Sequence, residues 1–184
     1  MIRTADDVNR MANLLALKIE NRRPDIRKHT DYVRGKRGTL KFASDEFKRY
    51  MSDRFSGFAD NWCLPVAQAP VERIHFRGFI PYGDVELDSH VMRVWERNDC
   101  DRKLQETALM MTTTGRAFGL VTSMPDGRAR ISFEHPDSAA VHYDPLTGEV
   151  DAGLLVRYDE EHEFGTLLLP DVVLDVVRVR AGGD

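Results

Sequence analysis

The sequence predicts an α+β fold, with N-terminal helices followed by a mostly antiparallel sheet. Apolar residues recur at helical spacing through much of the chain up to Thr114, and short β-favouring runs separated by turn residues fill the rest. The later part lacks the crossover helices that parallel strands need. A chain of 184 residues can bury its own core. We therefore expect a single domain over 1–184, made of a helical segment (1–70) and an α+β sheet segment (71–184).

Three helices are expected in the N-terminal segment. Thr4 and Asp7 form a capping box at the start of the first helix, which is expected to end near Arg22. Its apolar stripe consists of Val8, Met11, Ala12, Leu15 and Ile19. Pro24 suits the first turn of a second helix, closed by Gly35. Ser44 is expected to cap a third, whose aromatic stripe we interpret as core: Phe47, Tyr50, Met51, Phe55 and Phe58.

Two prolines predict an interruption in the next helical stretch. Pro65 and Pro70 are expected to kink or break the chain between Leu64 and Val71, because an interior proline removes a backbone donor and clashes with the preceding turn. Beyond it, alternating residues over 72–80 predict a strand.

Two more helices are expected before the sheet. Asp88 and Asp101 are the expected N-caps, and Gly115 lies where a C′ residue must accept a positive φ. Both helices are expected to lay apolar residues on the strand that follows Gly115. The expected cluster is Trp95, Leu104, Leu109, Phe118 and Val121.

Six strands are expected after Gly115. The turn Pro125-Asp126-Gly127 separates the first two, because the proline presets φ and the glycine relieves the chain reversal. The expected strands cover 117–122, 129–133, 139–143, 150–158, 166–169 and 172–179.

Charge is distributed unevenly along the chain. The net charge is −4, from 26 basic and 30 acidic residues. The segment from Lys18 to Arg49 holds 11 basic and 5 acidic residues, or +6, which leaves 15 basic and 25 acidic residues elsewhere, or −10. We interpret this segment first as a solvated helix face and second as a contact for phosphate or an acidic partner. The residues for such a contact are Arg22, Arg23, Arg27, Lys28, Arg34, Lys36 and Arg37.

Several kinds of chemistry are not predicted. The sequence lacks the glycine-rich loop that cradles nucleotide phosphates, and no apolar run is long enough to cross a bilayer. The acidic N-terminus predicts no secretory signal, so we expect a cytosolic protein. Cys63 and Cys100 are expected to be reduced, buried thiols. His135 and His142 are interpreted as structural histidines. We therefore expect no enzyme, no catalytic or metal-binding residues and no cofactor.

Five sequence elements occur in the order typical of one known family. The central element is Trp-Glu-Arg-Asn-Asp-Cys-Asp at 95–101, a helical stretch, and Gly-Arg-Ala-Phe-Gly-Leu-Val at 115–121. It is preceded by Asp-Tyr-Val-Arg-Gly at 31–35 and Asn-Trp-Cys-Leu-Pro-Val at 61–66. It is followed by His135-Pro136 and by Tyr-Asp-Pro-Leu-Thr-Gly-Glu at 143–149. Together they resemble, over residues 12–170, the wing region of portal (head-to-tail connector) proteins of tailed double-stranded DNA phages, siphophage type.

The resemblance implies a structural, non-enzymatic protein corresponding to the N-terminal wing portion of a portal. Members of the family form dodecameric rings at the portal vertex of the virion, after assembly in the host cytoplasm. The implied partners are other portal subunits, the large terminase subunit, the major capsid protein and head-completion or adaptor proteins. Double-stranded DNA passes through the ring during packaging and ejection without sequence-specific binding, and no membrane is involved.

The family's later parts, the stem, clip and crown, are absent from this sequence, so the chain is expected to be truncated. On its own it is expected to be a monomer or a loose, concentration-dependent oligomer.

Two other functions remain open from the sequence. One is a metal-dependent hydrolase that uses the carboxylates and imidazole of Asp159, Glu160, Glu161, His162 and Glu163. The other is a small interaction module that holds nucleic acid or an acidic partner with the basic segment from Lys18 to Arg49.

Overall fold

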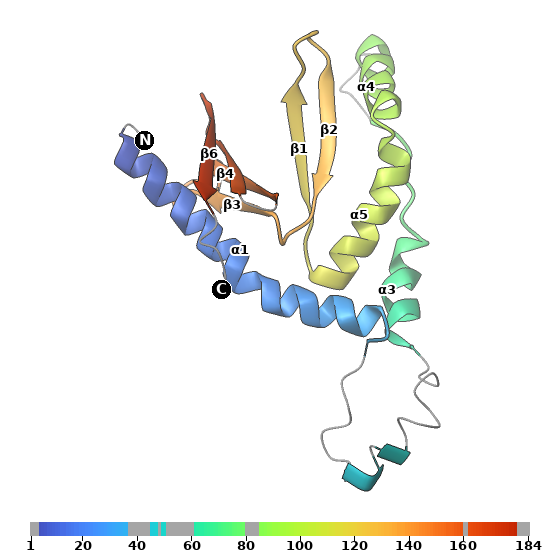
Figure 1. Cartoon of the computed structure of the whole chain (residues 1–184). Helices are drawn as coiled ribbons and strands as arrows, with labels where there is room; N and C mark the ends of the chain where they lie inside the picture. Colours follow the sequence, from blue (N-terminus) through green and yellow to red (C-terminus); the bar gives the residue numbers. More distant parts are fainter. Residues whose placement is uncertain are drawn as a thin grey trace. The chain divides into compact units, whose positions relative to one another are not determined.

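The computed structural model describes residues 4–36, 45–47, 49–50, 61–79, 85–159 and 162–179. Its helices are α1 (Ala5–Val33), α3 (Cys63–Val71), α4 (Val85–Arg97) and α5 (Cys100–Thr114). Its strands are β1 (Phe118–Ser123), β2 (Ala129–Glu134), β3 (Ala139–Tyr143), β4 (Val150–Tyr158), β5 (His162–Leu168) and β6 (Val173–Val179) (Figure 1). β1 and β2 form an antiparallel hairpin, and β3-β4-β5-β6 form a four-stranded antiparallel sheet. The predicted α+β fold, with helices before antiparallel strands, is confirmed.

The chain forms two compact units. The sheet unit comprises Met1–Pro24 and Ala117–Asp184, and the helical unit comprises Asp25–Arg116. Their boundaries differ from the predicted division at residue 70, because the first helix packs with strands from the end of the chain.

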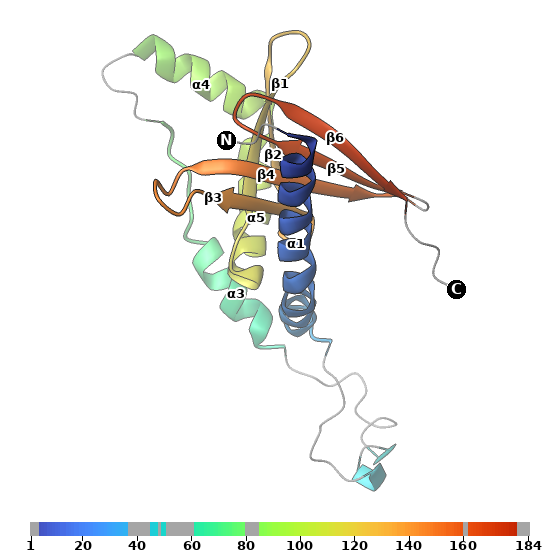
Figure 2. The same cartoon turned by 90° about the vertical axis from the view of Figure 1, so that its left-hand side faces the viewer.

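The core of the sheet unit lies between α1 and one face of the four-stranded sheet. Leu15 and Ile19 of α1 are buried in one cluster with residues from β3, β4 and β5: Ala140, Ala152, Leu154, Val156 and Leu167. Val8, Met11 and Ala12 pack against this cluster, so the predicted apolar stripe is confirmed. Figure 2 shows the N-terminal part of α1 lying across the strands.

The first helix is longer than the sequence predicted. Its start is as expected, because the backbone amide of Asp7 donates to Thr4 Oγ1 at 3.2 Å and the amide of Thr4 donates to Asp7 Oδ2 at 3.3 Å. The predicted end near Arg22 and restart at Pro24 are wrong, since α1 continues through Pro24 to Val33. Tertiary packing on both sides of the proline, including buried Ile26, offsets the lost backbone bond.

α3 is also continuous where a break was expected. Pro65 lies in the first turn of the helix, where a backbone amide has no intrahelical acceptor, so its missing donor costs little. Pro70 is the penultimate residue, and the chain closes the helix just beyond it, with the Glu72 amide bonded to Gln68 O at 3.0 Å.

The predicted strand over 72–80 does not form within 72–79, the part that the structure describes. The alternation does describe burial, because Ile74 and Phe76 are half-buried while His75 and Arg77 are exposed. The residues pack on helices instead of a sheet: Phe76 stacks on Trp95 with ring centroids 4.3 Å apart. Alternating burial shows that the segment has one buried and one exposed side, but among the described residues no strand lies beside it to form backbone hydrogen bonds.

Both predicted N-caps of α4 and α5 are wrong. α4 begins at Val85, three residues before Asp88. α5 begins at Cys100, with Asp99 as N-cap in the left-handed region at φ 53°. Asp101 Oδ1 instead accepts a hydrogen bond from Trp95 Nε1 at 2.8 Å. The predicted C-terminal end of α5 is confirmed, since Gly115 has φ 82° and its backbone amide donates a hydrogen bond to Met111 O.

Some expected core positions are exposed. Val121 is 67% exposed, which contradicts its predicted burial beside Phe118, because alternate residues of the β1–β2 hairpin face solvent. Trp95, Leu104, Leu109 and Phe118 are half-buried. Of the aromatic stripe after Ser44, Phe47 and Tyr50 are 46% and 54% exposed; Ser44, Met51, Phe55 and Phe58 lie outside the described residues.

Truncation of Leu15 tests the packing of α1 on the sheet. Leu15 is fully buried, so Leu15→Ala should lower the free energy of unfolding by about 2–5 kcal/mol. Leu17 lies on the same helix but is 56% exposed, and Leu17→Ala should change it by less than about 0.5 kcal/mol. Urea denaturation of both variants gives the comparison, and equal effects would contradict the packing.

Candidate interaction surface

Two of the seven predicted contact residues, Arg22 and Arg23, are engaged within the sheet unit. Arg22 Nη1 donates to the carbonyl oxygens of Pro136 and Ala139, both at 3.3 Å, and the guanidinium lies 5.8 Å from the Phe118 ring centre. Arg23 donates to Asp137 O at 3.2 Å through Nε and at 3.1 Å through Nη2. These donors satisfy carbonyls of the β2–β3 connection and of the first residue of β3, so this pair has a structural role.

Arg23 also meets the sheet through Tyr158. Its Nη2 donates to the Tyr158 hydroxyl, and its guanidinium lies 5.0 Å from the ring centre. A cation over an aromatic face is attracted by the ring quadrupole. The contact therefore attaches α1 to the end of β4, in addition to the bonds to the β2–β3 connection.

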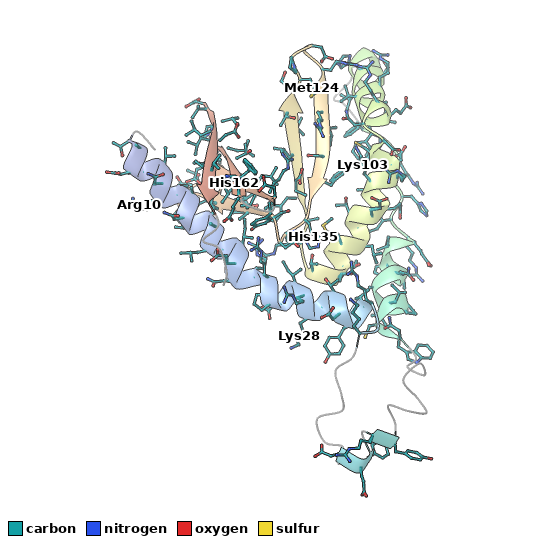
Figure 3. All side chains as sticks on the ribbon, viewed as in Figure 1. Arg10, Lys28, Lys103, Met124, His135 and His162 are labelled. Atoms are coloured by element: carbon teal, nitrogen blue, oxygen red, sulfur yellow. The ribbon has the colours of Figure 1, made fainter. Side chains whose placement is uncertain are left out.

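Four other predicted contact residues remain available to a partner. Arg27, Lys28, Arg34 and Lys36 are exposed, and their side chains make no hydrogen bond or ion pair with another described residue. Lys28 projects from the C-terminal part of α1 (Figure 3). Arg37 lies outside the described residues. The structure thus separates the basic segment into a structural arginine pair and exposed cations near the end of α1.

A shallow apolar groove lies in the helical unit, beside the end of α1. Three of its large apolar or aromatic residues are exposed: Trp62 is 70% exposed, Val66 73% and Tyr32 49%. Exposed apolar clusters of this kind mark interaction sites more often than isolated exposed residues do. The groove is lined by His29, Tyr32 and Val33 of α1; Trp62, Cys63, Val66, Ala67 and Pro70 from α3 and its start; and Thr112, Thr113, Thr114 and Gly115 from the end of α5.

Asn61 joins the two chain segments that border the groove. Its Nδ2 donates to Val33 O, the last residue of α1, at 2.6 Å. Gly35 has φ 72°, and a Cβ added there would lie 3.3 Å from Asn61 Nδ2. Only glycine adopts this backbone easily and leaves room for the amide. The two earliest family-like elements, 31–35 and 61–66, therefore meet at this point.

Thr112 joins the other wall of the groove to α3. Its Oγ1 lies 3.0 Å from Ala67 O and 3.0 Å from Leu109 O. Ala67 is buried at this contact, with 8% of its surface exposed. The groove is not apparent from the sequence, because Pro65 and Pro70 predict a break in the helix, and a broken helix would not present Trp62 and Val66 together.

The two cysteines differ in environment. Cys100 is fully buried, and burial raises the pKa of its thiol. Cys63 is half-buried and lines the groove. The predicted pair of free thiols is confirmed, but only Cys100 is a core residue.

The proposed hydrolase cluster is divided by the sheet. His162 contacts the Asp159 turn, with Nδ1 3.6 Å from Asp159 Oδ1, and its ring lies near Phe164 on one face of β5. Glu163 lies on the other face, where it lines a small cavity beside Asn9 and Asn13 of α1. Glu160 and Glu161 are outside the described residues. Within the described ranges, no group of three or more His, Cys, Asp or Glu residues is arranged to hold a metal ion.

Two histidines have carboxylate partners that the sequence did not predict. His135 Nδ1 lies 2.6 Å from Asp137 Oδ1 within a turn, and His142 Nδ1 lies 2.7 Å from Asp151 Oδ1. The second pair spans β3 and β4 where the register shifts between His142 and Tyr143. A strand irregularity of this kind re-aims a side chain and leaves little trace in the sequence.

Comparison with known proteins finds no matching family model and no similar curated protein. Among the helices that the structure describes, none is long and apolar enough to cross a membrane.

Replacement of Gly35 tests the junction that borders the groove. Gly35→Ala should cost about 1–2 kcal/mol of stability, because alanine at positive φ is strained and its methyl would crowd Asn61. Gly119 has an ordinary φ and open space around it, so Gly119→Ala should be neutral within about 0.5 kcal/mol. Thermal unfolding compares the two variants; a neutral Gly35→Ala would show that the junction is not held as described.

Proposed function

We propose that the protein is a structural component of a phage portal vertex, related to the portal wing, and acts by assembly instead of catalysis. The observation that carries the proposal is where the family-like elements lie. Gly35 and Asn61 close one junction, Gly115 ends α5, and Asp144 to Gly148 form a hydrogen-bonded turn between β3 and β4. Residues at the ends and junctions of helices and strands help to maintain a fold. Members of a family of structural proteins share their fold, so such residues are the ones expected to be common to them.

The groove of the helical unit gives the second line of support. A subunit that works by assembly must leave apolar surface for its neighbours, and Trp62, Val66 and Tyr32 form such a surface. Exposed cations near the end of α1 lie within the same unit. These features fit a protein that functions within a larger complex.

The two alternatives have weaker support. The hydrolase would need His162 and Glu163 to converge on one ion, and they lie on opposite faces of β5. In the nucleic-acid module, Arg22 and Arg23 would contribute little to phosphate binding, because their guanidinium groups donate to backbone carbonyls. Calorimetric titration with manganese or calcium tests the hydrolase. The portal proposal predicts no heat of stoichiometric metal binding, whereas a metal-dependent hydrolase predicts it.

Incorporation into virus particles tests the proposal directly. Phage particles produced from the native gene locus should contain the chain at the family's dodecamer stoichiometry relative to the major capsid protein. Mass spectrometry with isotope-labelled peptides measures that ratio. Absence from particles, or a copy number close to that of the capsid protein, would contradict a portal-vertex role.

Binding to DNA separates the proposal from the nucleic-acid module. A channel wall should bind duplex DNA weakly, because many phosphate contacts would hold DNA that must slide. We expect no saturation by fluorescence anisotropy at micromolar protein near physiological salt. The quadruple Ala variant of Arg27, Lys28, Arg34 and Lys36 should reduce the residual low-salt signal. Tight binding with a steep salt dependence, abolished by that variant, would support the module instead.

A further inference from the structure

The turn between β3 and β4 holds a leucine in solvent. Leu146 is 93% exposed, the highest fraction among the large apolar residues that the structure describes. Its backbone amide donates to Asp144 Oδ1 at 2.7 Å, and the Gly148 amide donates to Asp144 O at 2.8 Å. The Asp144 amide donates to Glu149 O at 2.8 Å and closes the turn. The turn projects from the sheet (Figure 2), and its hydrogen bonds fix the backbone that carries Leu146.

Apolar and acidic residues surround this leucine. Tyr143 and Val150 are partners across β3 and β4, and each is 57% exposed. They extend the apolar surface at the base of the turn. The segment 143–151 contains no lysine or arginine but has three acidic residues: Asp144, Glu149 and Asp151. Glu149 is exposed, and its carboxylate makes no hydrogen bond or ion pair with another described residue. The turn is therefore an apolar tip with negative charge beside it.

The groove of the helical unit has the opposite charge. Its walls from α3 and α5 are uncharged, because residues 62–71 and 107–115 contain no lysine, arginine, aspartate or glutamate. The end of α1 supplies the charge. Residues 25–36 hold four basic and two acidic residues, or +2: Arg27, Lys28, Arg34 and Lys36 against Asp25 and Asp31. Lys28 lies one helical turn before Tyr32, which lines the groove, so positive charge borders the apolar surface.

Tip and groove complement each other in two respects. Both expose apolar surface that is favourable to remove from water, and their local charges have opposite signs. The hydrogen-bonded turn is also preorganised, so little backbone entropy is lost when it is bound. Two tips would bring carboxylates together and two grooves would bring cations together. Only contact between unlike surfaces is attractive.

We propose that the β3–β4 turn of one copy docks in the groove of a second copy. Leu146 packs on Trp62 and Val66, and the Glu149 carboxylate faces the cations at the end of α1. Every copy carries both surfaces, so the occupant of each groove is the turn of the next copy. A contact between two different surfaces is heterologous, repeats head to tail, and closes into a ring where the rotation between copies permits.

The inference rests on the proposed function, because it names the contact between neighbouring subunits of the assembly. The two fail separately: particle incorporation tests the portal role, and association of the free chain tests this contact. One turn in a shallow groove buries little surface. Association of the free chain is therefore weak and depends on concentration.

Mixing two variants tests whether unlike surfaces meet. Leu146→Asp removes the apolar tip and leaves the groove, whereas Val66→Asp alters the groove and leaves the tip. In sedimentation velocity, each variant alone should associate at least about ten-fold more weakly than the parent chain. An equal mixture should form one-to-one dimers that do not extend, because only one intact tip and one intact groove meet. The parent should form a concentration-dependent series beyond dimers.

Val121→Asp is the matched control, since it adds the same charge at a 67% exposed position on β1. It should associate like the parent. A parent chain that is monomeric at all concentrations, or that stops at dimers, would overturn the head-to-tail contact. No dimer in the mixture, or equal weakening by Val121→Asp, would do the same.

A charge variant tests the electrostatic part of the contact. Glu149→Lys should weaken association by about two- to five-fold at low salt, the range for an exposed ion pair. The difference from the parent should shrink near 1 M salt, where the Debye length is about 3 Å. Glu20→Lys makes the same charge change at an exposed position of α1 and should have no effect. Equal weakening by both variants, or none by Glu149→Lys, would remove Glu149 from the contact and contradict the proposed charge pairing.

Discussion

The sheet unit depends on burial of one apolar helix stripe against one sheet face. Leu15 and Ile19 enter a cluster with Leu154, Val156 and Leu167, and these residues come from opposite ends of the described chain. The hydrophobic contribution of such a cluster is large relative to the net stability of a domain. The helix that supplies the stripe continues through Pro24 into the helical unit, so the same element also carries Tyr32 and Val33 to the groove.

Two arginines of the basic segment serve the structure of the sheet unit. Arg22 and Arg23 are part of the basic segment, yet their guanidinium groups bind backbone carbonyls next to Pro136, which is itself fully buried. Unpaired carbonyls at such a connection would be costly, so these arginines offset a desolvation penalty. The exposed cations Arg27 and Lys28 follow on the same helix without such partners among the described residues.

Apolar surface remains exposed on each unit when it is considered by itself. The helical unit has the groove around Trp62 and Val66, and the sheet unit has the β6 edge with Val173 and Val177. A groove between helices accepts side chains, whereas a strand edge accepts backbone. The two surfaces therefore fit different kinds of contact.

The sequence by itself determined that helices precede the strands, the capping box at Thr4, the stripe through Leu15 and the left-handed turn at Gly115, because each depends on local backbone preference or a short period. It did not determine whether Pro24, Pro65 and Pro70 interrupt helices, since the cost of a proline depends on its helix position and on packing from distant residues. Tertiary structure alone decided the role of Arg22, the His142–Asp151 pair and the groove between α3 and α5. These features join residues far apart in the chain or at strand irregularities, and no local pattern specifies which distant groups will meet.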